Sequence, residues 1–272
     1  MNCPHCSSPD TKRLARATVL GYQIFHCRHC QRKFNERTGT PFNFLEYPTD
    51  IVLLVVLWRL RYRLTLRDLA EMFLERGFQF THEAVREWEE RFAPLITGKL
   101  RARRRRQAGT SWYGDETYIK VGGHWCYLYR AIDRDGTLVD CMLSRKRDRE
   151  TARYFFKGAV EVVGHKPDRV TTDGYDVYPR AVAEELGEEV RHRTSRYLNN
   201  RLEQDHRGIK QRYYCMRGFK CFQAASQFCQ AFDELRNYLR PRQQMKQAIS
   251  LSAQRRVHLE RMGDLKGMLQ AA

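Results

Sequence analysis

The sequence predicts an α/β protein that carries two smaller modules ahead of its α/β core. Two CxxC pairs lie within the first 40 residues, which is typical of a small metal-bound module. Residues 49–96 have helical patterns throughout, and from about residue 111 a run of strands is followed by alternating helices and strands. The length of 272 residues is sufficient for one large core and one or two small modules.

The composition indicates a polyanionic partner. Lys and Arg number 49 against 32 Asp and Glu, which gives a net charge of +17. Such an excess favours a nucleic acid first and an anionic membrane second. We expect no membrane partner, because the longest apolar run, Ile51–Trp58, is about half as long as a spanning helix. The N-terminus lacks the features of a signal peptide, and nine cysteines, an odd number, favour a reducing cytoplasm over a disulfide scaffold.

Residues 1–40 are predicted to form a zinc ribbon. The segment between the two CxxC pairs predicts two strands joined at a Gly turn, which would bring four thiolates into a closed tetrahedral site. Such a small module buries little core, so zinc would supply roughly 10–16 kcal/mol of its folding free energy. A redox dithiol is the alternative. The predicted zinc ligands are Cys3, Cys6, Cys27 and Cys30.

Basic residues in the ribbon would allow it to contact DNA phosphates. They are Arg28, Arg32, Lys33 and Arg37.

Residues 49–100 are predicted to form a helix-turn-helix module for DNA binding. Thr65 with Asp68 has the spacing of a capping box, Gly77 ends the helix that begins there, and Thr81 caps the next one. The last helix would present His82 and Arg86 to DNA. An ordinary helical bundle is the alternative. The basic segment 101–109 is expected to be a linker that either contacts DNA or serves as a charged spacer.

Three acidic residues lie at positions that indicate a function. Asp115 lies in the middle of the first of three strands joined by Gly turns, where an Asp is unfavourable. Asp173 follows the short strand 169–172, with Asp176 as an alternative, and Glu203 lies on a later helix. We expect Asp115, Asp173 and Glu203 to converge at one sheet edge. They would repel one another unless two Mg²⁺ or Mn²⁺ ions, about 4 Å apart, bound them and acted on a phosphodiester.

The helix that carries Glu203 is otherwise basic. Arg207 and Lys210 follow at offsets that place them near the same face and are expected to contact phosphates, while His206 either assists at the metal site or is structural. Asp205 is expected to face solvent. A second basic patch, of Arg145, Lys146 and Arg147, is also predicted to contact phosphates, with a solvated charge run as the alternative.

The blocks "DETYIKVGGHWCYLYRAIDRDG", "TTDGYDVYP" and "SRYLNNRLEQDHRGIKQR" resemble the catalytic blocks of insertion-sequence DDE transposases, and the insertion sequence six family most closely. The resemblance covers roughly residues 49–240. It implies an RNase H-like catalytic core, placed at residues 110–240, with Asp115, Asp173 and Glu203 as the catalytic triad. Residues 241–272 are expected to be a polar tail, helical or frayed.

The resemblance also implies a prokaryotic transposase that acts on double-stranded DNA. It would cleave the 3′ ends of the element at its terminal inverted repeats and transfer them into target DNA. Two element ends imply a homodimer or a larger synaptic complex. The alternatives are a zinc-dependent DNA-binding regulator with an inactive core, which would bind without cutting, and an RNase H-like nuclease or resolvase, which would cut without joining.

Overall fold

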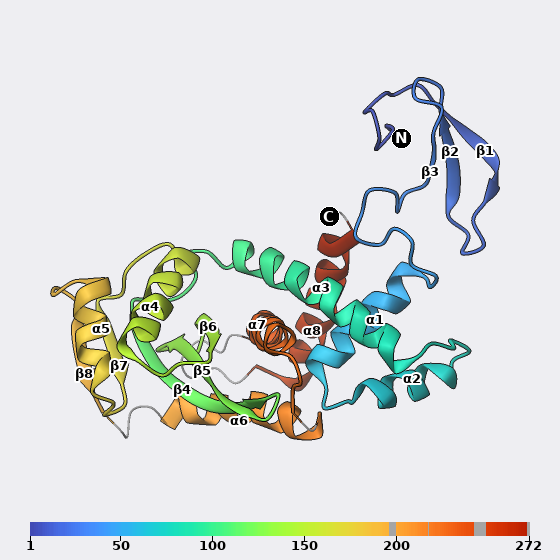
Figure 1. Cartoon of the computed structure of the whole chain (residues 1–272). Coiled ribbons are helices and arrows are strands. Elements are labelled where there is room, and N and C mark those ends of the chain that lie inside the picture. The colour runs from blue at the N-terminus through green and yellow to red at the C-terminus, as the bar shows by residue number, and fades with distance from the viewer. Residues whose placement is uncertain (196–199, 217, 242–248, 271–272) are drawn as a thin grey trace.

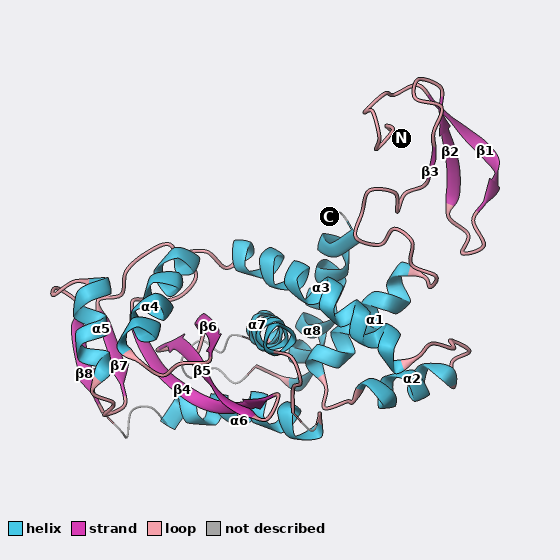
Figure 2. Ribbon diagram, in the orientation of Figure 1, coloured by secondary structure: helices cyan, strands magenta, loops and turns pink. Residues whose placement is uncertain are grey.

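The computed structural model describes residues 1–195, 200–216, 218–241 and 249–270. Residues 196–199 of the block "SRYLNNRLEQDHRGIKQR" and residues 242–248 and 271–272 of the expected tail lie outside the described residues. The chain forms an elongated body of helices around a mixed sheet, and a small β lobe projects from one end of it (Figure 1). From β4 onward, three strands are followed by alternating helices and strands and then by three helices, so the predicted α/β class is confirmed (Figure 2).

The projecting lobe is the three-stranded antiparallel sheet β1 (Thr11–Ala17), β2 (Gln23–Cys27) and β3 (Lys33–Phe34). Gly21, at φ +84°, lies in the turn between β1 and β2, as the Gly turn predicted. Arg37 is buried where this lobe joins the body, and its guanidinium donates to the carbonyls of Phe42 and Leu45 at 2.6 and 2.7 Å. The expectation that Arg37 contacts phosphate is therefore wrong, because its guanidinium binds backbone carbonyls of the loop that joins the lobe to the body.

The helical module contains α1 (Thr49–Arg61), α2 (Leu66–Leu74) and α3 (His82–Arg103). Both predicted caps are present. The Thr65 hydroxyl accepts from the backbone N–H of Asp68, the Asp68 carboxylate accepts from the N–H of Thr65, and the Thr81 hydroxyl accepts from the N–H of Ala84. These bonds satisfy backbone donors that a helix N-terminus leaves free. The inner faces of α1, α2 and α3 meet in one aromatic and aliphatic core, whose largest members are Leu53, Phe73, Trp88 and Phe92.

The basic segment after residue 100 is not a free linker. Helix α3 continues through its first residues to Arg103. The guanidinium of Arg104 is buried and forms two hydrogen bonds with Glu234, at 2.6 and 2.8 Å. Arg101 binds the same carboxylate at 3.1 Å and Asp140 at 2.6 Å. Two of the arginines expected to contact DNA or act as a spacer thus attach α3 to the sheet and to α7 (Phe222–Leu239).

The central sheet has the strand order β6-β5-β4-β7-β8. Strands β4 (Ser111–Val121), β5 (His124–Asp133) and β6 (Leu138–Ser144) form the predicted antiparallel meander, and β7 (Arg169–Thr172) and β8 (Arg191–Thr194) run parallel to β4. Three antiparallel strands followed by two parallel ones on the far side of the first is the arrangement of an RNase H-like core.

Helices cover both faces of this sheet. Helices α4 (Arg149–Val163) and α5 (Val177–Leu186) pack on one face through Phe155, Phe156 and Tyr178. Helices α6 (Asn200–Cys215) and α7 lie on the other, where the sheet shares a continuous core with the helical module. The tail forms α8 (Leu251–Gln270), which buries Leu265 and Leu269 against that core. The described part of the tail is therefore helical and packed.

Candidate active site

The three predicted acids come from three separate elements. Asp115 lies in the middle of β4, Asp173 directly follows β7, and Glu203 is in the first turn of α6. Because β4 and β7 are neighbours in the sheet, the end of β7 brings Asp173 beside the middle of β4. The Asp173 carboxylate accepts from the backbone N–H of Tyr175 at 3.0 Å.

The electrostatics of Asp115 show that the charges of the other two carboxylates reach it. Burial raises the pKa of Asp115, and the charges of Asp173 and Glu203 add to that rise, so that the pKa reaches about 7. A carboxyl group whose pKa is raised by both burial and like charges is typical of a site that holds a cation. Asp176, the alternative to Asp173, is exposed, and its charge is not among those that shift the pKa of Asp115 most.

Helix α6 contributes residues of different exposure to this region. Glu203 and Arg207 are exposed and Lys210 is half-buried, whereas His206 is buried. Nε2 of His206 lies 3.8 Å from Asp115 Oδ2 and has no hydrogen-bond partner. Burial and the neighbouring Arg130 lower the pKa of His206 to about 3, so its ring is neutral. Since Arg130 can only donate to Nδ1, at 3.4 Å, the ring carries its hydrogen on the nitrogen that faces Asp115.

A buried ionic network behind Asp115 was not predicted. Arg130 is the cross-strand partner of Asp115 on β5 and is 1% exposed. Its guanidinium forms two bonds with Asp233 of α7, at 2.6 and 2.7 Å, and a third with Asp205 of α6 at 2.5 Å. Asp205 also binds Arg236 at 2.6 Å, so the expectation that it faces solvent is wrong. An Arg in the middle of an otherwise apolar and aromatic strand was the signal for this network.

Arg147, one of the predicted DNA contacts, is partly engaged within the protein. Its guanidinium pairs with Glu116, the buried neighbour of Asp115, and lies 3.9 Å from the ring centre of Tyr175. Glu116 also accepts a hydrogen bond from Tyr178 of α5. Arg147 thus connects the segment before α4 to β4, while Arg145 and Lys146 beside it are exposed.

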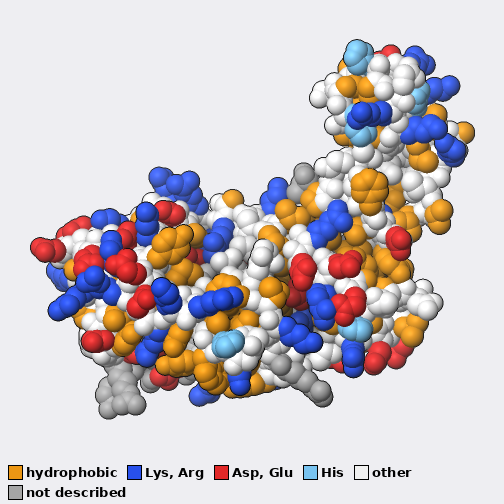
Figure 3. Space-filling view, viewed as in Figure 1, with side chains coloured by type: hydrophobic (Ala, Val, Ile, Leu, Met, Phe, Trp, Pro, Cys, Tyr) orange, Lys and Arg blue, Asp and Glu red, His pale blue; other side chains and the backbone are white. Residues whose placement is uncertain are grey.

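The structure places the remaining predicted DNA contacts apart from one another. His82 and Arg86 lie at the start of α3, partly exposed, and both pair with Glu83. Arg207 and Lys210 lie on α6, four and seven residues beyond Glu203. In the view of Figure 3, Lys and Arg are spread over the whole length of the molecule, including the β lobe, without forming a single continuous patch.

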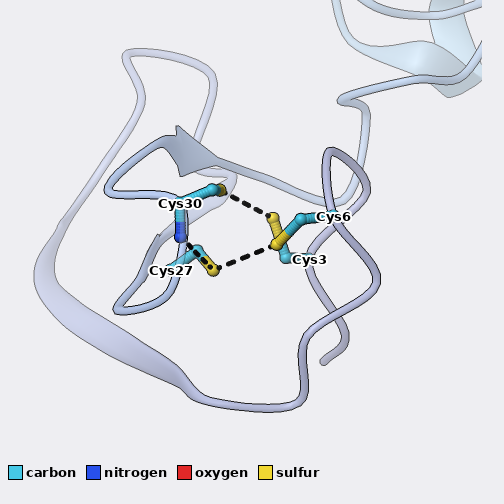
Figure 4. Close-up of side chains that lie close together, drawn as sticks. All are labelled: Cys3, Cys6, Cys27 and Cys30. Atoms are coloured by element: carbon cyan, nitrogen blue, oxygen red, sulfur yellow. Dashed lines mark hydrogen bonds between the residues drawn. The ribbon is translucent and has the colours of Figure 1, made fainter.

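The four predicted zinc ligands converge within the β lobe, as Figure 4 shows. Their sulfur atoms all lie within 4.8 Å of one another, with Cys3–Cys30 and Cys6–Cys27 both at 3.6 Å. Sulfurs at the corners of a tetrahedron with metal–sulfur distances of about 2.3 Å would be about 3.8 Å apart, so the cluster fits a zinc ion. The backbone N–H of Cys30 donates to Cys27 and, as the largest cause, lowers the pKa of that thiol to about 6, whereas the pKa values of Cys6 and Cys30 are raised by burial and by the neighbouring thiols.

The three carboxylates are arranged more openly than the thiols. Within the described residues, the cysteine cluster is the one group whose potential ligand atoms all lie within 4.8 Å of one another.

Comparison with known proteins defines the class. A family model described as a DDE domain matches residues 109–242, a range that contains all three acids. With the mixed sheet, this match defines a DDE-type polynucleotidyl transferase.

Relatives identify the family. The transposase for insertion sequence-like element IS431mec of Staphylococcus aureus is 38% identical over 175 residues, which cover 63% of this chain and 77% of the relative. The transposase for insertion sequence element IS257 in transposon Tn4003, from the same species, is 37% identical over the same share of both chains. The chain belongs to the insertion sequence six family of DDE transposases and is a DNA transposase.

The solved structures that are similar to part of this chain include retroviral integrases. The HTLV-2 integrase catalytic core domain in complex with magnesium, in its dimeric form, has a TM-score of 0.37 and 16% identity, and the match covers 57% of this chain and 99% of that one. The simian T-cell lymphotropic virus intasome with the B56 gamma subunit of PP2A also has a TM-score of 0.37, with 14% identity over 57% of this chain and 56% of that one.

In the described part of this chain, no helix has the length and apolar character needed to cross a membrane.

Proposed function

We propose that Asp115, Asp173 and Glu203 are the catalytic triad and hold two Mg²⁺ or Mn²⁺ ions. The observation that carries this is the pKa of Asp115, which burial and the two other acids raise to about 7. A bound divalent pair would remove that repulsion, activate a water molecule and stabilise the leaving oxygen of a phosphodiester.

The residues around the triad hold it in place. His206 directs its N–H toward Asp115, and Arg130 keeps that ring in position while it joins β5 to α6 and α7. Arg207 and Lys210, on the same helix as Glu203, would hold the phosphates of the strand to be cut. The reaction proceeds by direct attack of water and then of the released 3′-OH, so the protein supplies no covalent nucleophile.

The proposed DNA substrate is double-stranded: the terminal inverted repeats of the element and a target duplex. Residues 49–100 would bind the element ends through His82 and Arg86, and Arg145, Lys146 and Arg147 would contact phosphates beside the core. Residues 1–40 would bind structural zinc through Cys3, Cys6, Cys27 and Cys30. Since two ends must be joined to one target, the working form is a homodimer or larger synaptic complex. We place this activity in the prokaryotic cytoplasm, on chromosomal or plasmid DNA.

Substitution of single acids tests the triad. In a cleavage assay on a labelled element end with Mg²⁺, D115N, D173N and E203Q should each lower the rate at least about 10³-fold, because metal binding and charge stabilisation are lost together. Binding of the same end should remain. The matched control is D135N, because Asp135 is an exposed acid in the β5–β6 turn. Cleavage by D115N at the wild-type rate would contradict the assignment.

The products distinguish the alternatives. Joining of the cut 3′ end to a target plasmid supports a transposase, cutting without joining supports a nuclease or resolvase, and binding without cutting supports a regulator.

A further inference from the structure

An exposed aromatic and basic pocket lies beside the proposed active site, and of its lining residues only Lys210 has a role in the mechanism above. Its volume is about 330 Å³, within the range of about 300–1,000 Å³ that small-ligand sites occupy. Two elements build it: the tip of the β4–β5 hairpin, and the C-terminal half of α6 with the segment that follows. The lining residues are Tyr118, Trp125, Lys210, Tyr213, Tyr214 and Gly218.

The rings of this pocket are unusually open to solvent. Trp125 is 59% exposed, Tyr214 is 68% exposed and Tyr118 is 47% exposed. Tyr118 and Trp125 meet edge to face with ring centres 6.3 Å apart, and Tyr213 and Tyr214 lie 5.6 Å apart. Large rings left exposed together are costly for a soluble protein unless a partner covers them.

The pocket is held in a fixed position relative to α6. The Tyr213 hydroxyl accepts from the backbone N–H of Lys120, and the N–H of Gly122 donates to the carbonyl of Phe219. These bonds attach the segment after α6 to the open edge of β4, so the hairpin tip and α6 lie side by side (Figure 1). Because both sides of the pocket are anchored, a ring stacked there would meet a preformed surface.

The charges around the rings point to an anionic chain. Lys120 lies over the ring of Trp125, with its ammonium 5.8 Å from the ring centre, and Lys210 lines the pocket itself. None of the described residues that line the pocket is acidic. Aromatic rings combined with lysines are the combination that binds single-stranded nucleic acid, because bases stack on the rings and phosphates meet the cations.

The distance to the acids fits one continuous DNA strand. Tyr118 is three residues beyond Asp115 on β4, which corresponds to roughly 10 Å along a strand. Lys210 is seven residues beyond Glu203 on α6, which is also roughly 10 Å along a helix. The pocket and the triad are therefore offset in the same direction along both elements. Because side chains alternate along a strand, Tyr118 lies on the sheet face opposite Asp115, so a strand cut at the acids would pass over the open edge of β4 to reach the rings.

We propose that this pocket binds unpaired bases of a DNA strand next to the scissile phosphate, with Trp125 and Tyr214 as stacking platforms. Holding the bases apart from their complement would keep the 3′ end at the acids between cleavage and joining. This inference rests on the proposed function, because it takes the DNA held at the triad as the occupant.

Equilibrium binding of a single strand of about 10 nucleotides to the full-length protein tests this directly. Buffer without Mg²⁺ and without chelator keeps catalysis out of the measurement and leaves any zinc in place. W125L and Y214L should each weaken single-strand binding about 5- to 100-fold, the usual loss when one stacked base loses its ring. Both rings are exposed, so neither change should unfold the protein. The matched control is Y154L, because Tyr154 is 71% exposed on α4, and it should bind like the wild type.

Tryptophan fluorescence provides a second readout. Trp88 and Trp112 are buried and Trp58 is half-buried, so quenching by the single strand should come mainly from Trp125 and should disappear in W125L. Wild-type affinity in both W125L and Y214L would overturn the inference. So would an equal loss of binding to a duplex of the same sequence, or a change in oligomeric state with unchanged affinity for the single strand, because the pocket would then be a general duplex surface or a contact between copies.

Failure of the pocket proposal can be distinguished from failure of the triad proposal. If D115N abolishes cleavage and W125L binds single strands normally, the proposed function stands and the pocket assignment fails. If W125L loses single-strand binding while D115N still cleaves, the triad fails and the pocket stands.

Discussion

At the scale of single residues, the protonation of Asp115 is the feature most closely tied to function. Its carboxyl group is largely removed from solvent, and this burial and the charges of two other acids together raise its pKa to about 7. In the unfolded chain the same group has a pKa near 3.8. The folded protein without metal therefore holds this proton more tightly than the unfolded chain does. As pH rises from about 4 to 7, the stability that the proton provides is lost.

A substitution that removes this titration should change how stability depends on pH. In metal-free protein, D115N should gain stability relative to the wild type as pH rises, and the difference should be roughly 2 kcal/mol larger at pH 8 than at pH 5. Urea unfolding at both pH values measures it, with D135N as control. Equal differences at the two pH values would mean that Asp115 has an ordinary pKa.

At the scale of elements, Arg130 joins three parts of the active-site framework. From β5 it binds Asp233 on α7 and Asp205 on α6, the helix that carries Glu203. Buried charges of this kind contribute little over an apolar alternative, but they are costly to leave unpaired. The network thus determines where α6 sits more than how stable the core is.

Replacing this arginine should be strongly destabilising. R130M would leave Asp233 buried without a cation and Asp205 paired with Arg236 alone, and the free energy of unfolding should fall by about 3–5 kcal/mol. R180M is the comparison, because Arg180 is exposed on α5, and it should change stability by less than about 0.5 kcal/mol. Chemical denaturation measures both variants. A small effect of R130M would show that the two acids accept protons or water without cost.

Elements with strong local signals could be predicted from the sequence. Turn glycines and alternating side chains indicated the β4–β5–β6 meander, and the cap at Thr65 indicated the start of α2. Asp115 and Asp173 could be singled out because an Asp in a strand and an Asp directly after one are unusual, and Glu203 because it lies on an otherwise basic helix. Long-range pairs could not be predicted. Arg104 looks like a surface charge until the fold buries it against Glu234, and the position of Arg130 in an apolar strand does not indicate that Asp233 is its partner.

At the scale of the whole molecule, the helical module and the catalytic core behave as one body. A single hydrophobic cluster contains Leu53 of α1, Phe92 of α3, Leu128 of β5 and Phe232 of α7, and α3 runs from the module to the edge of the sheet. The β lobe is more separate and has its own small core around the four cysteines (Figure 1). DNA held by the helical module would therefore have a fixed position relative to the acids.

The net charge of +17 predicts DNA binding that is sensitive to salt. If about 6–10 phosphates are neutralised, affinity for an element end should fall about 10³- to 10⁵-fold between 50 and 200 mM salt. Fluorescence anisotropy over that range gives the slope of the logarithm of the binding constant against the logarithm of the salt concentration. The double variant R207Q/K210Q should reduce the slope by about 2, as expected if both side chains contact phosphates. A flat response in the wild type would exclude the proposed phosphate contacts.

The most direct test of the central claim is to locate the metal ions. Crystals of the full-length protein bound to a cleaved element end, grown with Mn²⁺, would be measured at the manganese absorption edge. The account predicts two anomalous peaks about 4 Å apart, bound by Asp115, Asp173 and Glu203. Manganese found elsewhere, or bound without Glu203 or Asp173, would contradict it.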